Sequence, residues 1–412
     1  MTLTLAGRVE EAKYAIRDPR IAQIVKEVRA TGKKIYEFNI GDPGALRGEY
    51  GFSMPEYIRS DLIRVISTGK FDGYANEQGD PEVRDAIAAD AKRRKISDAK
   101  PENVVVGNGL SELIGYLFGV TLDKGKNIVV PRPDYPLYTA MAKWYGAQVR
   151  HYDLLPEKKW SPDLKQLEAA IDPNTAWVVA IHPNNPTGSV INSESMAEMV
   201  RIVGKAGKNQ VPLMSDEIYH RLRFDGKPHP AMASFSEDVP IITMDGFSKG
   251  FYSPGWRLGH VLFSNFPDTR IMDALVKVCA FRLSGNQALQ MSYAHALDNL
   301  HEYAEEQKSY LNKMKERVAF GAKRVNSIPG LEVIPPEGAF YMFPRVLKGP
   351  WKTDSEFVEQ LLRQEGIRVV PGSGFSMKPE DRYFRMVPLG SKEFQAEAFA
   401  KMASFMERSI GK

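Results

Sequence analysis

One lysine of the 412-residue chain has neighbours that favour covalent chemistry. Lys249 follows the apolar run IITMD within GFSKGFYSPGWRLGH, so we expect it at the carboxyl end of a strand, flanked by small residues. A lysine in that position can form an imine with a carbonyl compound. Arg257 follows within GWRLG, where glycines let the backbone approach a ligand closely. Taken alone, Lys249 is explained better as a solvated surface lysine.

A carboxylate, a phenol and an amide follow two other apolar runs. SDEIY closes VPLM and contains Asp216 and Tyr219, and HPNNPTG follows WVVAI and contains Asn185. A buried carboxylate can hold a ring nitrogen protonated, although Asp216 could also cap a helix. Asn185 offers an amide donor, although Asn, Pro and Gly also favour a simple turn. Each residue therefore has both a functional and a structural interpretation.

Two further clusters could hold a phosphate and a planar ring. In GNGLSEL, the residues Gly109, Leu110 and Ser111 open a predicted helix, whose free N–H groups can bind phosphate without a lysine. Tyr135 in PDYPLY could stack on a planar ring or belong to the core. Together the five clusters provide an imine partner, a counter-ion, donors to a phenolic oxygen, a phosphate cradle and a stacking face. These are the requirements of pyridoxal 5′-phosphate, which we predict as the cofactor.

The elements that must position these residues alternate along the chain. From about residue 100, short apolar runs alternate with helical stretches, which indicates a mostly parallel sheet covered on both faces. Ligands of such sheets bind outside the carboxyl ends of the strands, where all five clusters fall. After residue 300, a long amphipathic helix and the segments LEVI, AFYMFP, IRVVPG and YFRMV predict a smaller α+β domain. We place a large domain at 56–300 and the small domain at 301–412, with the N-terminal segment 1–55 packing against the small domain.

Composition and charge argue against several other classes of protein. Lysine plus arginine total 55 against 51 acidic residues, a net charge of +4, and no run of like charge forms a nucleic-acid-binding stripe. No apolar run approaches the roughly 18–20 residues that cross a bilayer, and the N-terminus lacks the apolar core of a signal peptide. One cysteine and no HExxH spacing argue against disulfides and a zinc site. We expect a cytoplasmic protein with no metal, nucleic-acid or membrane partner.

The ordered set GNGLSEL, PDYP, HPNNPTG, SDEIY and SKGFYSPGWRLG resembles the class I/II aminotransferases of the pyridoxal-phosphate fold-type I superfamily. The resemblance extends from NIGDP near residue 40 to YFRMV near residue 385. It implies an α/β fold in which a mostly parallel, mainly seven-stranded sheet between helices forms the cofactor-binding domain, beside a smaller α+β domain. It also implies a homodimer with shared active sites and a place in amino-acid metabolism.

The resemblance assigns catalytic roles to the clustered residues. Lys249 is similar to the lysine that forms the Schiff base and moves the proton, and Asp216 to the partner of the pyridinium nitrogen. Asn185 and Tyr219 match the residues that bond the phenolic oxygen, and Asn185 also matches a residue beside the substrate. Tyr135 is similar to the aromatic residue that stacks on the ring.

The phosphate and the substrate carboxylate have their own matches. The residues that match the phosphate site are Gly109, Leu110, Ser111, Arg257 and, from GYANEQG, Tyr74, which is similar to a tyrosine that reaches the phosphate of the neighbouring subunit. Arg385 in YFRMV matches the arginine that grips the substrate α-carboxylate bidentately, a fork geometry that lysine cannot copy. Gly41 matches a glycine that lines the substrate.

The sequence departs from the family pattern beside the lysine. Many members place a hydroxyl three residues before it to help hold the phosphate, and here that position is Gly246. Ser248 is adjacent to the lysine instead, and we expect it to contribute to cofactor binding.

The substrate is predicted from these motifs together with segments outside them. EGAFYMFPR, KGPWKTDSEFVEQLL and VVPGSGF resemble the alanine aminotransferase branch. We therefore expect a ping-pong exchange between an L-amino acid, alanine first, and the 2-oxoglutarate/glutamate pair. FRLSGNQALQ is similar to the segment Arg-x-Cys-Pro-Asn of that branch, with Ser284 and Gly285 replacing Cys-Pro. Arg282 is accordingly a hypothetical receptor for the distal carboxylate of glutamate, and a structural arginine is an equal alternative.

Other functions on this fold stay open. An aspartate, aromatic or broad-specificity aminotransferase, a β-lyase or a decarboxylase would share Lys249 and Asp216 and differ in how the substrate is placed. A non-enzymatic regulator would need a basic DNA-binding domain ahead of the fold, whereas the aminotransferase pattern begins by about residue 20.

Overall fold

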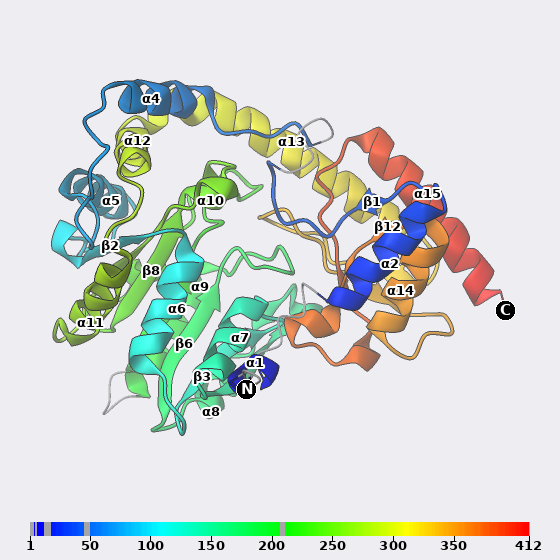
Figure 1. The fold of residues 1–412 in the computed structure, drawn as a ribbon. Helices are drawn as coiled ribbons and strands as arrows, with labels where there is room; N and C mark the ends of the chain where they lie inside the picture. The colour runs from blue at the N-terminus through cyan, green and yellow to red at the C-terminus, as the bar shows by residue number, and fades with distance from the viewer. Residues whose placement is uncertain (1–3, 5, 12–17, 45–49, 207–210, 412) are drawn as a thin grey trace.

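The computed structural model describes residues 4, 6–11, 18–44, 50–206 and 211–411. A large mixed sheet with helices on both faces occupies one side of the molecule, and a second assembly of helices and short strand pairs occupies the other (Figure 1). The long helix α13 (Leu300–Asn326) runs from one to the other.

The main sheet has the order β2-β9-β8-β7-β6-β3-β4-β5. The predicted apolar runs form seven of its strands: β2 (Val104–Gly107), β3 (Asn127–Arg132), β4 (Gln148–Leu155), β6 (Thr175–Ile181), β7 (Leu213–Asp216), β8 (Ile241–Gly246) and β9 (Gly259–Ser264). Strands β4, β3, β6, β7 and β8 pair in parallel, and β9 and β2 join antiparallel. The sheet is thus mixed and mostly parallel, as expected.

Within the described residues the main sheet has one strand more than expected. An eighth strand, β5 (Ser161–Pro162), pairs antiparallel with the end of β4 at the sheet edge. Two residues that include a proline carry no apolar periodicity, so no sequence pattern predicts this strand.

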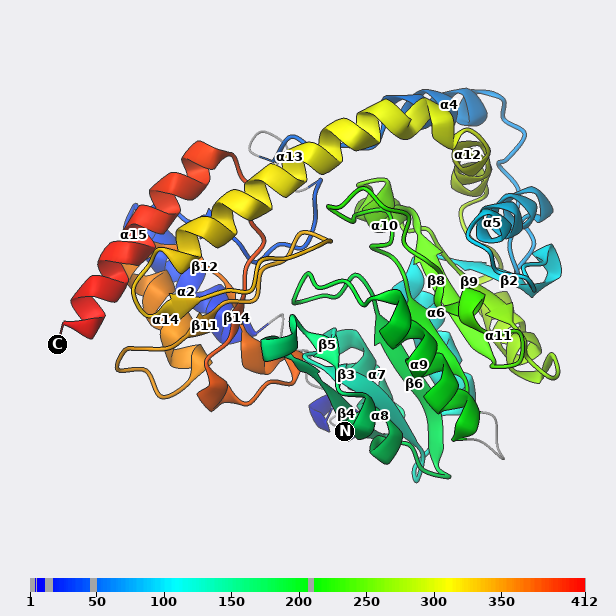
Figure 2. The ribbon, with the colours of Figure 1, turned by 180° about the vertical axis from the view of Figure 1, so that it is seen from behind.

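The seven longer strands of the sheet contribute to two apolar cores because successive side chains point to opposite faces. Val105 packs with α6 (Leu110–Thr121), α7 (Pro136–Trp144) and α11 (Arg270–Cys279) on one face. Its neighbours Val104 and Val106 belong to the core of the other face, which α8 (Leu164–Ala170) and α9 (Ser193–Lys205) cover. Figure 2 shows α8 and α9 in front of the sheet, opposite the face seen in Figure 1. The two buried faces explain why the strands are continuous apolar runs.

Three helices pack together near the β2 end of the sheet. They are α4 (Glu56–Ser67), α5 (Pro81–Arg93) and α12 (Gln287–Asp298), and α12 contacts both of the others. From there α13 continues with Met314, Val318, Ala322 and Val325 on its buried face, as its amphipathic pattern predicts.

The second assembly is built from segments near both ends of the chain. Strand β1 (Tyr36–Glu37) pairs in parallel with β12 (Ile367–Arg368), while β10 (Leu331–Glu332) pairs with β11 (Arg345–Val346) and β13 (Val370–Pro371) with β14 (Phe384–Arg385). Helices α2 (Pro19–Ala30), α14 (Asp354–Glu365) and α15 (Lys392–Ile410) cover these pairs. The domain boundaries at residues 55 and 300 stay a prediction.

One strand prediction in this assembly is wrong. AFYMFP forms no ladder and makes only an isolated bridge, Met342 to Met386, among the described residues. Its side chains are buried all round, so its apolar composition reflects packing rather than strand pairing.

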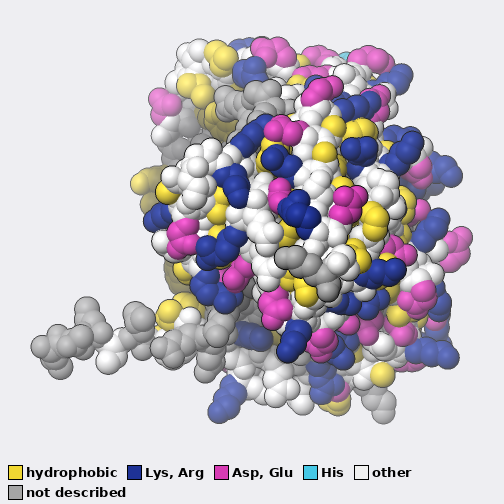
Figure 3. Space-filling view, turned by 90° about the vertical axis from the view of Figure 1, so that its right-hand side faces the viewer, with side chains coloured by type: hydrophobic (Ala, Val, Ile, Leu, Met, Phe, Trp, Pro, Cys, Tyr) yellow, Lys and Arg dark blue, Asp and Glu magenta, His cyan; other side chains and the backbone are white. Residues whose placement is uncertain are grey.

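Lys and Arg side chains are interspersed with Asp and Glu over the face drawn in Figure 3. Within the described ranges, no helix combines the length and the apolar character that a membrane span requires. The same ranges contain no group of three or more His, Cys, Asp and Glu residues that could hold a metal ion.

Candidate active site

A cavity of 670 Å³ opens at the carboxyl ends of β6, β7 and β8, where the second assembly faces the sheet. Most of the predicted site residues line it: Gly41, Leu110, Ser111, Tyr135, Asn185, Asp216, Tyr219, Ser248, Lys249, Arg257 and Arg385. They come from segments that are up to 344 positions apart in the chain (41 to 385). The fold therefore collects residues that the sequence only suggests are related.

Lys249 lies on the short helix α10 (Phe247–Gly250), directly after β8. Its Nζ atom donates a hydrogen bond of 2.6 Å to the carbonyl oxygen of Gly41 and lies 5.6 Å from the ring centre of Phe340. Burial lowers the pKa of the Lys249 amine to about 8. Near neutral pH a usable fraction of this amine is therefore unprotonated.

Asp216 ends β7 and is buried. Its Oδ2 atom accepts a 2.7 Å hydrogen bond from the hydroxyl of Tyr138, and Oδ1 accepts one of 3.3 Å from the backbone N–H of Ile218. Both donors are neutral, and burial raises the pKa of Asp216 to about 6. A cation bound beside this carboxylate would stabilise its charged form.

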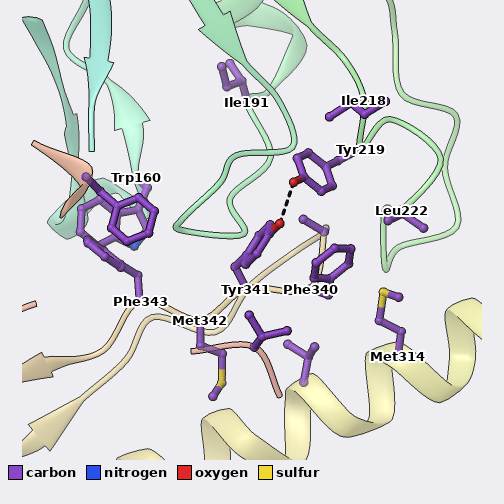
Figure 4. Packing of buried hydrophobic residues seen from close by; sticks show 14 of the residues in the cluster. Trp160, Ile191, Ile218, Tyr219, Leu222, Met314, Phe340, Tyr341, Met342 and Phe343 are labelled. Carbon is purple, nitrogen blue, oxygen red and sulfur yellow. Dashed lines mark hydrogen bonds between the residues drawn. The ribbon is translucent and has the colours of Figure 1, made fainter. Parts of the chain in front are cut away.

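Tyr219 follows β7 and meets a residue of the second assembly. Its hydroxyl lies 2.7 Å from that of Tyr341, and the two rings approach edge to face (Figure 4). Burial raises the pKa of Tyr219 well above its usual range, so the phenol keeps its proton. A Cβ atom on Gly41 would lie 2.8 Å from the Tyr341 hydroxyl, so the Gly41 backbone can pass here only because it has no side chain.

Arg385 is buried on the side of the cavity opposite the sheet. Its Nη1 donates to Oδ1 of Asn185 at 3.1 Å and its Nη2 to the carbonyl oxygen of Asn39 at 2.9 Å. The guanidinium carbon lies 4.9 Å and 4.8 Å from the ring centres of Tyr341 and Phe375. Considering the described residues alone, Nε of Arg385 is buried without a hydrogen-bond partner.

Arginine donates only, so Asn185 must present its carbonyl oxygen to Arg385. Its amide Nδ2 is then the end of the side chain that can donate to a ligand. The contact with Arg385 thus decides the orientation of the Asn185 amide, which distance alone does not reveal.

The first turn of α6 forms an anion-binding corner of the cavity. Gly109 precedes this helix with a φ of +84° and has no side chain to cap it. Leu110 and Ser111 line the cavity at the positive end of the helix dipole. The guanidinium group of Arg257 lies against Gly109, and a Cβ atom on Gly109 would collide with it. Backbone N–H groups and one guanidinium therefore meet where a phosphate could bind.

The missing hydroxyl at position 246 has a steric explanation. A Cβ atom on Gly246 would lie 2.6 Å from the carbonyl oxygen of Leu258 and 2.7 Å from Cα of Gly259. No side chain fits at that point, whereas Ser248 lines the cavity.

Tyr74 and Arg282 lie outside this cavity. Tyr74 is 81% exposed and, together with Trp256, lines a separate hollow of 380 Å³, here named the second hollow. Arg282 forms an ion pair of 3.0 Å with Glu112 and donates to the carbonyl oxygen of Val106 at 2.7 Å. The role of Arg282 toward a substrate stays a prediction.

Comparison with known proteins identifies the family. The profile described as aminotransferase class I and II matches residues 35–400. The chain belongs to the class I and II aminotransferases. It is 31% identical to a glutamate-pyruvate aminotransferase AlaA of Haemophilus influenzae, over 97% of both chains, and 31% identical to a mouse tyrosine aminotransferase, over 91% of this chain and 82% of the relative. The solved structure of an alanine aminotransferase from Pyrococcus furiosus superposes with a TM-score of 0.91 at 34% identity, covering 98% and 100% of the chains.

This aminotransferase family depends on pyridoxal phosphate, and the cavity fits that cofactor. Among the described residues Asp216 has only neutral hydrogen-bond donors, so a protonated ring nitrogen would supply the cation that its charged form lacks. The uncapped N-terminus of α6 and Arg257 suit a phosphate, and Lys249 suits an aldehyde. Tyr135 supplies an aromatic ring in the cavity wall.

Three residues of the site had no assigned role from the sequence. Tyr138 lies three positions after Tyr135 in the same motif, so helical spacing could have suggested it. Tyr341 belongs to EGAFYMFPR, which the sequence linked to alanine aminotransferases without a function. Arg368 lines the cavity from β12, and a lone arginine between apolar residues gives no signal of its partners.

Proposed function

We propose that this aminotransferase moves the amino group of L-alanine to 2-oxoglutarate by a ping-pong mechanism. The observation that carries the proposal is the convergence of Lys249, Asp216 and Arg385 in one cavity. An amine of tuned pKa, a buried carboxylate and a carboxylate-binding guanidinium are together what amino transfer requires. Glutamate-pyruvate and alanine aminotransferases among the relatives support alanine as the donor.

Arg385 binds and orients the α-carboxylate. Its fork of N–H donors matches the two oxygen atoms of a carboxylate. Its buried Nε atom has no hydrogen-bond acceptor among the described residues, so it can donate to a bound carboxylate. The flanking rings of Tyr341 and Phe375 fix the plane of the guanidinium and limit its hydration. A carboxylate held there presents the Cα atom of the substrate in a defined direction.

Pyridoxal phosphate supplies an electrophilic carbonyl carbon and a ring that withdraws electrons from Cα. Lys249 Nζ takes the Cα proton and returns one, because its pKa of about 8 allows both states near neutral pH. Asp216 holds a proton on the ring nitrogen. Tyr219 and the Nδ2 atom of Asn185 donate to the phenolic oxygen. Leu110, Ser111, Ser248 and Arg257 hold the phosphate.

We also propose a homodimer in which Tyr74 reaches the phosphate of the neighbouring subunit. Tyr74 and Trp256 are 81% and 48% exposed around the second hollow, beside Arg257 of the active site. Phe281 and Leu283, 79% and 53% exposed, precede Ser284 of the same hollow. Exposed apolar side chains gathered beside a site favour a protein partner there.

An aromatic or broad-specificity aminotransferase is the second candidate. The mouse tyrosine aminotransferase is as similar to this chain, at 31% identity, as the glutamate-pyruvate aminotransferase is.

The test is incubation of the enzyme with L-alanine and 2-oxoglutarate, with glutamate and pyruvate measured as products. We expect equal amounts of both, and parallel lines in double-reciprocal plots. Tyrosine or aspartate outperforming alanine would favour the second candidate, and release of carbon dioxide or a side chain would overturn amino transfer.

A further inference from the structure

Among the described residues that line the cavity, Arg368 has a guanidinium group to which neither the cofactor nor the α-carboxylate gives a role. Arg368, on β12, lines the cavity together with Arg257 and Arg385. Arg257 lies at the phosphate corner and Arg385 at the proposed α-carboxylate position. Arg368 therefore adds a positive charge to the part of the cavity left for the rest of the substrate.

Arg368 and Arg385 approach the same backbone segment. The N–H of Phe38 donates to the carbonyl oxygen of Arg368 at 2.9 Å, and the guanidinium of Arg385 donates to the carbonyl oxygen of Asn39 at 2.9 Å. The register of β1 and β12 places Arg368 opposite Glu37. The backbone of Arg368 and the guanidinium group of Arg385 thus bond to adjacent residues, and both side chains line the same cavity, so one bound molecule can contact both.

The charged groups around Arg368 carry more positive than negative charge, which favours binding of a further anion. Glu37 accepts from Nη1 of Arg368 through Oε2 at 3.1 Å, and from Nη2 of Arg29 through Oε1 at 3.1 Å. One carboxylate therefore balances two guanidinium groups. As far as the described part of the chain goes, Nε and Nη2 of Arg368 have no hydrogen-bond partner.

We propose that Arg368 binds the distal carboxylate of a dicarboxylic substrate, glutamate or 2-oxoglutarate, an inference that rests on the proposed function. A site that alternates between alanine and glutamate must accept both a methyl group and a carboxylate. With alanine bound, Glu37 keeps Arg368 paired. With glutamate bound, Arg368 can donate to the substrate while Arg29 remains on Glu37, so no buried charge is left alone.

Arg282, the receptor suggested by the sequence, is less well placed. Its guanidinium pairs with Glu112 and donates to the carbonyl oxygen of Val106, and it does not line the cavity of its own chain. Arg368, in contrast, lines the cavity, as a substrate-binding role requires.

The test compares Arg368→Gln with Arg363→Gln in steady-state kinetics of the holoenzyme. Arg363 lies on the surface of α14 and pairs with Glu27 at 2.7 Å, so its variant removes a similar ion pair outside the cavity. We expect Arg368→Gln to lower kcat/KM for 2-oxoglutarate and glutamate roughly 10- to 100-fold, the loss of a charged hydrogen bond, and to change values for pyruvate and alanine less than about threefold. Arg363→Gln leaves both pairs unchanged.

A binding measurement separates this role from a loss of catalysis. Glutarate, a dicarboxylate, and butyrate, a monocarboxylate of similar size, are titrated into the holoenzyme by calorimetry. We expect Arg368→Gln to weaken glutarate roughly tenfold or more and to leave butyrate unchanged.

The outcomes distinguish this inference from the proposed function. A wild-type enzyme that fails to use glutamate or 2-oxoglutarate overturns the proposed substrates. A wild-type enzyme that uses them, with an Arg368→Gln variant that loses all four substrates equally or loses none, overturns the role of Arg368.

Discussion

At the scale of single residues, Asp216 combines a functional requirement with a cost to folding. Its buried carboxylate accepts hydrogen bonds only from neutral donors among the described residues, and its pKa is raised to about 6. Since the pKa in the unfolded chain lies near 3.8, the folded apoenzyme loses stability as the pH rises from about 4 to about 6. A protonated ring nitrogen beside Asp216 would remove this penalty, because its positive charge would stabilise the carboxylate.

We predict that Asp216→Asn stabilises the apoenzyme at pH 7 and inactivates the holoenzyme. The gap between about 6 and 3.8 corresponds to up to about 3 kcal/mol in the free energy of unfolding. Asparagine keeps an acceptor for Tyr138 but cannot hold the ring nitrogen protonated, so we expect activity to fall at least about 100-fold. Urea unfolding of both apoenzymes across pH measures the first effect. The stability difference should vanish as the pH approaches 4, and a constant difference would contradict the titration of Asp216.

The residues that sequence reasoning identified are those whose chemical type is tied to a short motif. Lys249, Asp216 and Asn185 each follow an apolar run, and parallel strands bring such positions to one edge. Tyr341 and Arg368 come from the second assembly, and their neighbours depend on how that assembly meets the sheet. Such long-range docking leaves no local pattern.

At the scale of elements, the start of α6 depends on a glycine. Gly109 has a φ of +84°, and a Cβ atom there would collide with Arg257. We predict that Gly109→Ala weakens binding of pyridoxal phosphate to the apoenzyme roughly tenfold or more, because either the first turn or Arg257 must move from the phosphate corner. Titration followed by the absorbance of the bound cofactor measures the affinity.

A matched control lies on the same helix. A Cβ atom on Gly115 would be 3.5 Å from Cε of Met141, an ordinary contact, so Gly115→Ala leaves cofactor affinity intact. Pyridoxal, which has no phosphate, provides a second comparison. If Gly109→Ala weakened pyridoxal as much as its phosphate ester, the phosphate assignment of this corner would be wrong.

The elements of the main sheet were predictable because each has its own apolar run. Seven strands follow from such runs, and the helix around Met314 and Val318 follows from its spacing. β5 escaped prediction because its two residues have no periodicity, and AFYMFP was misassigned because a fully buried segment resembles a strand in composition.

At the scale of the whole molecule, the proposed homodimer depends on one apolar surface. Tyr74, Trp256, Phe281 and Leu283 are all about half exposed or more, in or beside the second hollow. The face drawn in Figure 3 has mixed charges instead, a surface typical of solvent contact. The exposed apolar side chains thus gather where Tyr74 would have to cross into a neighbouring subunit.

We predict that Phe281→Glu converts the dimer to a monomer and lowers activity. A glutamate at this position, where the side chain is 79% exposed in the isolated chain, would place a charge against the apolar surface of the partner. Light scattering coupled to size-exclusion chromatography measures the mass, for which 46.2 kDa is the single chain. Leu347→Glu is the matched control, because Leu347 is also exposed, at 44%, and lies outside the hollow. If activity were lost without a change in mass, Phe281 would act in the active site of its own chain. If the variant stayed dimeric and fully active, the two chains would have to associate through another surface.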